Sequence, residues 1–265
     1  MVNRSNDCRW YFPCHGKELK CNHISRNIRA FRGSIILLKR TQYQSALGGR
    51  VGGRCKTRTT VSGEIMGLLA EIRTNPIIAA VRDIRDLEKA VASKVNAIFL
   101  LTGDINSLSE CVEFVQEAGK GVYLHLDLIK GLGHDRAAVG YLARKVKPNG
   151  VISTRSNLLK SAKAEGLYTI QRIFMLDSLS LRTAMFSIRK TEPDAVECLP
   201  AIIPRVFSEL VHEVRQPIIA GGLIKHYSEL IKTLRSGVKA VSISSQQFWN
   251  YSLKKEDFDE SRGIY

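Results

Sequence analysis

The sequence predicts an α/β fold, a (β/α)8 TIM-like barrel with a disordered basic N-terminal extension. Three observations lead to this fold class. From residue 76 onward, eight short runs rich in apolar and β-branched residues alternate with seven helical patterns. The connections are short, and eight is the number of strands in such a closed parallel barrel. An open, doubly wound sheet is the alternative architecture.

The eight runs are the predicted strands, because buried parallel strands are rich in apolar residues. In chain order they are PIIAAVR (76–82), AIFLLT (97–102), GVYLHLD (121–127), GVIST (150–154), YTIQRIF (168–174), DAVECL (194–199), PIIAGG (217–222) and AVSISS (240–245). Prolines stand at or just before four of them: Pro76, Pro148, Pro193 and Pro217.

The seven segments between the strands space their apolar residues by three and four, which is typical of an amphipathic helix. The predicted helices are 85–93, 106–119, 134–146, 155–166, 177–190, 203–214 and 227–237. Glycine commonly ends a helix, and Gly119, Gly166 and Gly237 lie at the ends of three of them.

Charge divides the chain into a strongly basic arm and a mildly basic remainder. The net charge is +15, and residues 1–65 hold 13 Lys and Arg against 3 Asp and Glu, which leaves 15 − 10 = +5 for residues 66–265. Such a charge favours an anionic partner, either nucleic acid or phosphate. We therefore expect a disordered basic arm (1–65), a barrel domain (66–253) and a charged tail (254–265).

The arm has two interpretations, because it lacks any sustained periodicity. It is either an RNA-binding arm that folds on contact or the product of a mis-called start. Gly63 and Glu64 require the codons GGN-GAR, a purine-rich string resembling a bacterial ribosome-binding site just before the Met66 codon. We favour the second interpretation and expect a native start at Met66.

The sequence carries no signal for secretion, for a membrane span or for a metal site. Its apolar runs are too short to cross a bilayer, and no cleavage pattern follows the run at 34–40. We expect a cytoplasmic protein with no membrane partner. A zinc site is conceivable in the arm, but the spacing does not match common zinc modules, so we expect no metal; its residues would be Cys8, Cys14, His15, Cys21 and His23.

A phosphate site is predicted where the seventh and eighth strands end. In such barrels a phosphate commonly binds at the loops after these two strands. Gly221 and Gly222 end the seventh strand and would let an anion approach the backbone, while Ser244 and Ser245 at the eighth would add hydroxyl donors. A short helix after Ser245 would also favour negative charge. The alternative for the glycines is a tight turn that needs positive φ.

Other polar residues fall at the carboxyl ends of the strands. Strand alternation places His125 and Asp127 on one face with Tyr123, and it points Arg172 and Glu197 into the barrel mouth. Arg155 follows the fourth strand. These side chains predict a pocket for a small hydroxylated phosphate ester. A ring of mutually paired salt bridges is the alternative, because buried charges need partners.

Four segments together resemble one known family, the glycerol-3-phosphate-responsive antiterminators: YLHLDLIKGLGHD (123–135), PNGVISTRSNLLKSAKAEGLYTIQRIFMLDS (148–178), ECLPAIIP (197–204) and PIIAGGLI (217–224). The resemblance covers about residues 70–250 and has no counterpart for residues 1–65. It implies a bacterial regulator that binds glycerol 3-phosphate and acts on the leader mRNA of a glycerol-metabolism operon, preventing termination at an inverted repeat.

On this resemblance the barrel is a sensor with no catalytic residue and no cofactor besides its effector. The phosphate would rest on Gly221, Gly222, Ser244 and Ser245, and the glycerol hydroxyls would meet residues such as Asp127, Arg172 and Glu197. The basic segments 143–147 and 187–190, with Lys254 and Lys255, are candidates for RNA contact.

Two other functions stay open at this point. The first is an enzyme of small phosphorylated molecules, such as an isomerase or phosphodiesterase, in which Asp127 and Glu197 serve as acid and base. A Schiff-base aldolase is excluded, because it needs a strand lysine and none of the eight runs contains one. The second is an inert remnant that only dimerises, and a homodimer is also left open for the regulator.

Overall fold

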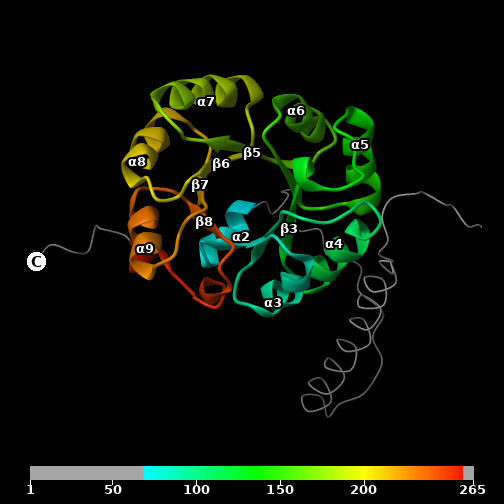
Figure 1. The fold of residues 1–265 in the computed structure, drawn as a ribbon, viewed down its shortest axis with the longest axis horizontal. Coiled ribbons are helices and arrows are strands. Elements are labelled where there is room, and N and C mark those ends of the chain that lie inside the picture. The colour runs from blue at the N-terminus through cyan, green and yellow to red at the C-terminus, as the bar shows by residue number, and fades with distance from the viewer. Residues whose placement is uncertain (1–67, 259–265) are drawn as a thin grey trace, which may run out of the picture. The chain divides into compact units, whose positions relative to one another are not determined.

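The computed structural model describes residues 68–258, which form a closed barrel of eight parallel strands (Figure 1). Each strand pairs with the next in chain order, and the last strand pairs with the first. The strands are β1 (Ile77–Val81), β2 (Ala97–Leu100), β3 (Gly121–His125), β4 (Gly150–Ser153), β5 (Tyr168–Phe174), β6 (Ala195–Leu199), β7 (Ile218–Gly221) and β8 (Ala240–Ile243). The predicted barrel is confirmed, and no strand end differs from its prediction by more than two residues.

The helices occupy the predicted positions between the strands and surround the barrel. They are α3 (Leu87–Ala92), α4 (Leu108–Glu117), α5 (Arg136–Tyr141), α6 (Ser156–Ala164), α7 (Ser178–Thr191), α8 (Pro204–Glu213) and α9 (Tyr227–Arg235). Shorter helical pieces are η1 (Ile84–Asp86), η2 (Leu126–Leu128), η3 (Leu142–Val146), η4 (Gln246–Phe248) and η5 (Lys255–Asp257). The predicted helix 134–146 is divided between α5 and the π-helical turn η3.

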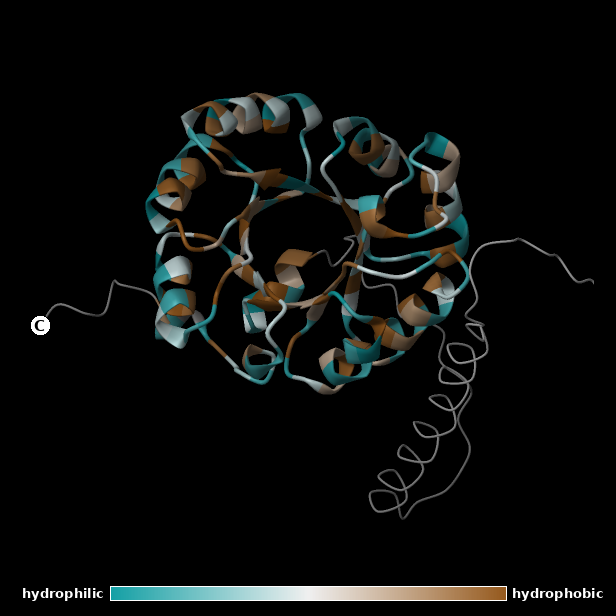
Figure 2. Cartoon of the chain, in the orientation of Figure 1, coloured by the Kyte–Doolittle hydropathy of each residue, from teal (hydrophilic) through white to brown (hydrophobic). Residues whose placement is uncertain are grey.

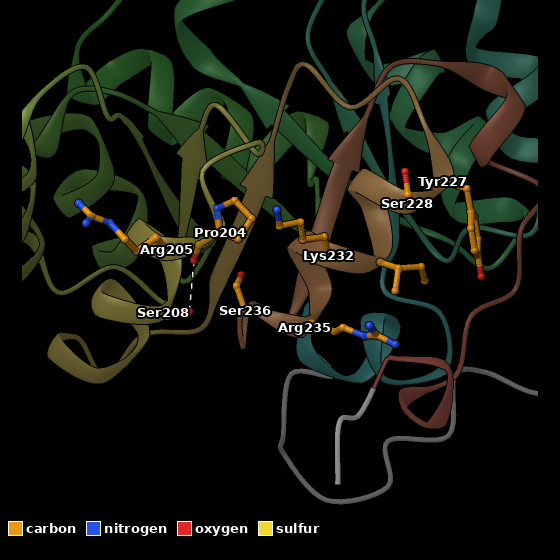
Figure 3. Close-up of a pocket in the computed structure, with 9 residues that line it drawn as sticks. Pro204, Arg205, Ser208, Tyr227, Ser228, Lys232, Arg235 and Ser236 are labelled. Carbon is orange, nitrogen blue, oxygen red and sulfur yellow. Dashed lines mark hydrogen bonds between the residues drawn. The ribbon is translucent and has the colours of Figure 1, made fainter. Parts of the chain in front are cut away.

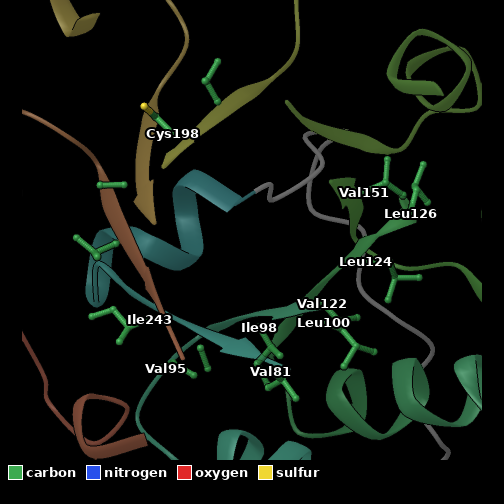
Figure 4. Packing of buried hydrophobic residues seen from close by; sticks show 14 of the residues in the cluster. Val81, Val95, Ile98, Leu100, Val122, Leu124, Leu126, Val151, Cys198 and Ile243 are labelled. Atoms are coloured by element: carbon green, nitrogen blue, oxygen red, sulfur yellow. The ribbon is translucent and has the colours of Figure 1, made fainter. Parts of the chain in front are cut away.

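Each strand has one face toward the helices and one toward the barrel axis, because side chains alternate along a strand. The outward residues form the larger apolar cluster with the helices, and Figure 4 shows part of it around Ile98, Leu100 and Val122. The inward residues form a second cluster that fills the barrel and includes Phe99 and Tyr123. In Figure 2 the brown, apolar colour accordingly follows the strands and the strand-facing sides of the helices.

A helix that was not among those predicted, α2 (Leu68–Thr74), lies against the opening of the barrel at the amino-terminal ends of the strands (Figure 1). Leu68 and Ile72 belong to the inner apolar cluster. The Glu71 side chain accepts a hydrogen bond from the Tyr123 hydroxyl (3.0 Å) and occupies the space where a Cβ on Gly121 would stand. Burial raises the pKa of Glu71 from 4.5 to about 7.

Several predictions concern residues outside the described range. They are the arm (1–65), the start at Met66, the Cys and His residues of the conceivable zinc group and the tail beyond residue 258. They stay predictions, as do the domain boundaries. Between residues 68 and 258, no helix has the length and apolarity needed to cross a membrane.

Replacing Glu71 should change how stability depends on pH. Because the folded protein holds the Glu71 proton up to about pH 7, the unfolded chain releases it first, and stability falls as pH rises from about 4.5 to 7. Glu71→Gln keeps an acceptor for Tyr123 without the charge. We expect its melting temperature to match the parent's near pH 4 and exceed it at pH 8, measured by thermal unfolding.

The matched control is Glu88→Gln, which removes an exposed carboxylate from α3. It should not produce the same difference between the two pH values. An equal gain of Glu71→Gln at pH 4 and pH 8 would contradict the buried, protonated carboxyl.

Candidate ligand-binding site

The inside of the barrel changes from apolar to polar toward the carboxyl ends of the strands, which we call the mouth. The change occurs within two residues on four strands: Tyr123 to His125, Ile170 to Arg172, Ala195 to Glu197 and Ala240 to Ser242. The lower interior is closed by aromatic rings, since Tyr123 makes edge contacts with Phe99 and Tyr168. Polar chemistry inside the barrel is therefore concentrated at the mouth.

Glu197 is the centre of the first polar group. Its Oε2 accepts a hydrogen bond from Arg172 Nε at 2.6 Å, and its Oε1 accepts one from Ser242 Oγ at 2.7 Å. The Glu197 side chain is 1% exposed and that of Arg172 is 9% exposed. Sequence alternation had placed both charged residues in the mouth but could not show that they pair. Ser242, which completes the group, was not among the predicted site residues.

Asp127 is the centre of the second polar group. The expectation that it lies on the third strand is wrong, because β3 ends at His125 and Asp127 belongs to the one-turn helix η2. From there its Oδ2 accepts hydrogen bonds from Ser153 Oγ (2.9 Å) and Thr154 N (3.0 Å) at the end of β4. Arg155 Nε lies 3.1 Å from Asp127 Oδ1 as an ion pair. The structure thus brings two predicted residues, Asp127 and Arg155, together.

His125 lies between the two groups and is 3% exposed. Burial, and then the positive charge of Arg172, lowers the pKa of His125 to about 4, although Asp127 opposes this shift. The imidazole is therefore neutral at pH 7, with one ring nitrogen that donates and one that accepts. Its Nδ1 is buried without a hydrogen-bond partner in the described residues and lies 3.7 Å from Asp127 Oδ2. A neutral histidine in this state can bind a ligand hydroxyl.

The two glycines at the end of β7 each have a reason in the protein itself. A Cβ on Gly221 would stand 2.7 Å from Ser242 Oγ and 3.0 Å from Glu197 Oε1, so any side chain would collide with the first polar group. Gly222 has φ of +82°, which is the turn conformation considered as the alternative. Leu223 follows with φ of +66°. The glycine pair is thus explained without a phosphate, and the phosphate contact stays a prediction.

Ser244 and Ser245 directly follow β8, next to the loop after β7. Ser244 is exposed and Ser245 half-buried, and the expected short helix after Ser245 is the one-turn η4. Gln247 Nε2 of η4 donates to the Lys225 carbonyl at 3.3 Å, which ties the two loops together. The structure therefore places all the predicted phosphate residues at neighbouring strand ends, as barrel geometry requires.

The geometry suits binding of a small, polar, hydroxylated molecule. Both carboxylates are engaged by an arginine and by a hydroxyl donor, and the neutral His125 has a ring nitrogen left over. In residues 68–258, no group of three His, Cys, Asp or Glu side chains is arranged to hold a metal ion. The mouth contains acceptors and donors for hydroxyls, and its two arginines, Arg172 and Arg155, are each paired with a carboxylate.

The fold and this polar mouth define a class, that of (β/α)8 barrels whose ligand site lies at the carboxyl ends of the strands. Within that class, the family model described as glycerol-3-phosphate responsive antiterminator matches residues 77–249. The match spans all eight strands and both polar groups. The chain belongs to this family.

Similar proteins agree with this membership. An uncharacterized protein of Escherichia coli K12, YgcP, is 34% identical over 189 residues, which are 71% of this chain and 99% of YgcP. A solved structure of a glycerol uptake operon antiterminator regulatory protein from Listeria monocytogenes is 35% identical, with a TM-score of 0.64, and the match covers 66% of this chain and 95% of that one.

A glycerol uptake operon antiterminator-related protein from Thermotoga maritima has also been solved. It is 28% identical, with a TM-score of 0.60, and the match covers 67% of this chain and 99% of that one. An N-acetylmannosamine-6-phosphate 2-epimerase from Clostridium perfringens is 17% identical with a TM-score of 0.52, which shows a shared fold alone.

Removing one partner of the buried Arg172–Glu197 ion pair should destabilise the protein more than removing both charges. Arg172→Met leaves the Glu197 carboxylate buried without its cation, which should lower the free energy of unfolding by about 3–5 kcal/mol. Adding Glu197→Gln removes the uncompensated charge and keeps an acceptor for Ser242. We expect the double variant to be more stable than Arg172→Met alone in urea unfolding. A double variant that is less stable than the single one would contradict this account.

Proposed function

We propose that the chain is a glycerol-3-phosphate-responsive transcription antiterminator. In this proposal it acts in the bacterial cytoplasm, binds the leader mRNA of a glycerol-metabolism operon when the effector is present and prevents termination. The observation that carries the proposal is the family match over residues 77–249, because it spans the strands that build the polar mouth. The mouth supports it further by offering partners for both ends of such an effector.

The effector would lie across the mouth with its phosphate toward β7 and β8. There it would meet backbone N–H groups of the loop at Gly222 and the hydroxyls of Ser244 and Ser245. Its glycerol hydroxyls would reach the other side of the mouth, where His125 has an unpartnered ring nitrogen and the carboxylate of Asp127 is 15% exposed. Arg172 would favour the negative charge of the phosphate ester, and Arg155, paired with Asp127, would lie on the glycerol side.

The same contacts favour a sensor over the alternative of an enzyme. A general base must be free to take a proton. The carboxylates of Glu197 and Asp127 each accept hydrogen bonds from a serine hydroxyl and lie against an arginine. His125 is neutral and is a weak base, since its pKa is lowered to about 4. In this proposal no catalytic residue and no cofactor is needed.

An effector can switch RNA binding only if it binds the RNA-competent state more tightly than the other state. The natural element for this selection is the pair of loops after β7 and β8. They contact each other through Gln247 and the Lys225 carbonyl. A phosphate seated between them would stabilise one arrangement of both loops.

The proposal predicts RNA binding that depends on glycerol 3-phosphate. A gel shift would use the full chain, the leader RNA of the glycerol operon from the same genome and a fixed salt concentration, because RNA affinity is salt-dependent. We expect a shift that appears or tightens with glycerol 3-phosphate but not with glycerol or inorganic phosphate. Ligand binding without any RNA shift, together with turnover of glycerol 3-phosphate, would instead support the enzyme.

Removing the two serine hydroxyls should weaken effector binding. Because each lost hydrogen bond to a charged group contributes about 1.5–3 kcal/mol, Ser244→Ala with Ser245→Ala should raise the Kd for glycerol 3-phosphate at least tenfold. Titration calorimetry would measure the change. Ser161→Ala on α6, outside the mouth, is the control and should leave the Kd unchanged. An unchanged Kd in the double variant would mean that the phosphate does not bind at the end of β8.

A further inference from the structure

A basic groove runs between α8 and α9 on the outside of the barrel (Figure 3). Its volume is about 670 Å³, within the ~300–1,000 Å³ range of ligand sites. The residues that define this α8–α9 groove are Pro204, Arg205, Ser208, Tyr227, Ser228, Ile231, Lys232, Arg235 and Ser236. Three of the nine are cationic, four carry hydroxyls, and none is a carboxylate. The groove therefore has the chemistry of an anion-binding surface.

Two of the cations have no ion-pair partner in the part of the chain that the structure describes. Lys232 and Arg235 are exposed and form no ion pair within residues 68–258. Arg205 is different, because it lies 3.8 Å from the exposed carboxylate of Glu209. Glu229, the acidic residue of α9, is turned to the start of its helix, where it accepts hydrogen bonds from the Lys225 and His226 backbone amides.

The free cations lie in a row. Ser228, Lys232 and Arg235 stand at helical spacings of four and three, so they share one face of α9. Figure 3 shows Lys232 extending from α9 toward α8. The row thus presents a hydroxyl and two positive charges along the wall of one groove. Such a row matches the repeated charge of a nucleic-acid backbone rather than a single small anion.

The end of the groove nearest the mouth carries aromatic side chains. Tyr227 is 48% exposed and packs edge to face on Tyr251, which is 40% exposed, with ring centroids 5.6 Å apart. Exposed aromatic rings beside a basic track are the combination that binds single-stranded nucleic acid, since bases stack on the rings while the backbone meets the cations. This combination is what favours RNA over an acidic protein as the occupant.

The groove is also connected to the ligand site. The Ala201 backbone amide donates to the Gly222 carbonyl at 3.1 Å, and the Ala201 carbonyl accepts from Thr233 Oγ1 of α9 at 3.0 Å. Tyr251 follows η4, and Tyr227 follows the loop after β7. The loops proposed to hold the phosphate therefore lie directly next to both aromatic residues, and Ala201 links Gly222 to α9.

We infer that the α8–α9 groove is the surface that binds the leader RNA, with Lys232 and Arg235 on its phosphodiester backbone and Tyr227 against an unpaired base. This inference rests on the proposed function and adds the location of the RNA. It also distinguishes this surface from two basic segments considered for RNA contact, 143–147 and 187–190. In these, Arg144 pairs with Glu165 at 3.0 Å and Arg189 lies 3.7 Å from Glu213.

The test compares two variants with the same loss of charge. Lys232→Ala with Arg235→Ala removes the free cations of the groove. Arg144→Ala with Lys145→Ala removes one Arg and one Lys from η3, on the other side of the barrel (Figure 1). Fluorescence anisotropy would give the Kd of the full chain for labelled leader RNA, with saturating glycerol 3-phosphate, over a series of salt concentrations.

The groove variant should bind RNA about 25-fold more weakly at about 0.1 M salt, because each phosphate contact contributes a slope of about 0.7 in log K against log salt. Its salt slope should decrease by about 1.4. Tyr227→Leu should weaken binding about fivefold or more with an unchanged slope, since stacking involves no counterion release. The η3 variant should bind like the parent.

Equal losses in both double variants, or a loss in the η3 variant alone, would overturn the inference and leave the proposed function standing. Calorimetry with glycerol 3-phosphate on each variant shows that the mouth is intact. If the parent chain binds the effector but no RNA at any salt concentration, both the inference and the RNA part of the proposed function are wrong.

Discussion

The buried charge of Glu197 determines the identity of its neighbours. A carboxylate that is 1% exposed is strongly destabilising unless a cation and hydrogen-bond donors surround it. Arg172 from β5 and Ser242 from β8 meet this need, and the positions of Ser242 Oγ and Glu197 Oε1 leave room only for glycine at position 221. One carboxylate thereby constrains residues on four strands, β5 to β8. The polar mouth depends on these contacts before any ligand is considered.

The lower half of the barrel explains why the ligand site can lie only at the mouth. Phe99, Tyr123 and Tyr168 fill the interior with rings in edge contact. Below them, α2 closes the barrel with Leu68 and Ile72, and Glu71 reaches Tyr123. Burial raises the pKa of that carboxyl to about 7, so below this pH the closed end is nearly neutral, whereas the mouth is built from charged pairs.

The strands and helices could be predicted because the burial of one face or of a whole strand leaves a short-range pattern of apolar residues in the sequence. Strands and helices followed from apolar runs and spacing, and Arg172 and Glu197 followed from alternation along single strands. Contacts between distant segments were not predictable. Ser242 meets Glu197 across 45 positions of the chain, and Ser153 at the end of β4 donates to Asp127 in η2, which follows β3. The helix α2 was missed because it precedes residue 76, where the alternation of strands and helices that predicted the other helices begins.

The segment AGGL shows that a glycine pair at a strand end can have a structural cause of its own. Gly221 is required by side-chain crowding and Gly222 by its backbone, so the pair does not itself indicate a phosphate. Leu223 is more informative, because a left-handed conformation costs a residue with a Cβ about 1–2 kcal/mol. It is 61% exposed, so burial of its side chain does not offset that cost. Strain of this kind accumulates where a loop serves a ligand, and Leu223 lies between the polar mouth and α9.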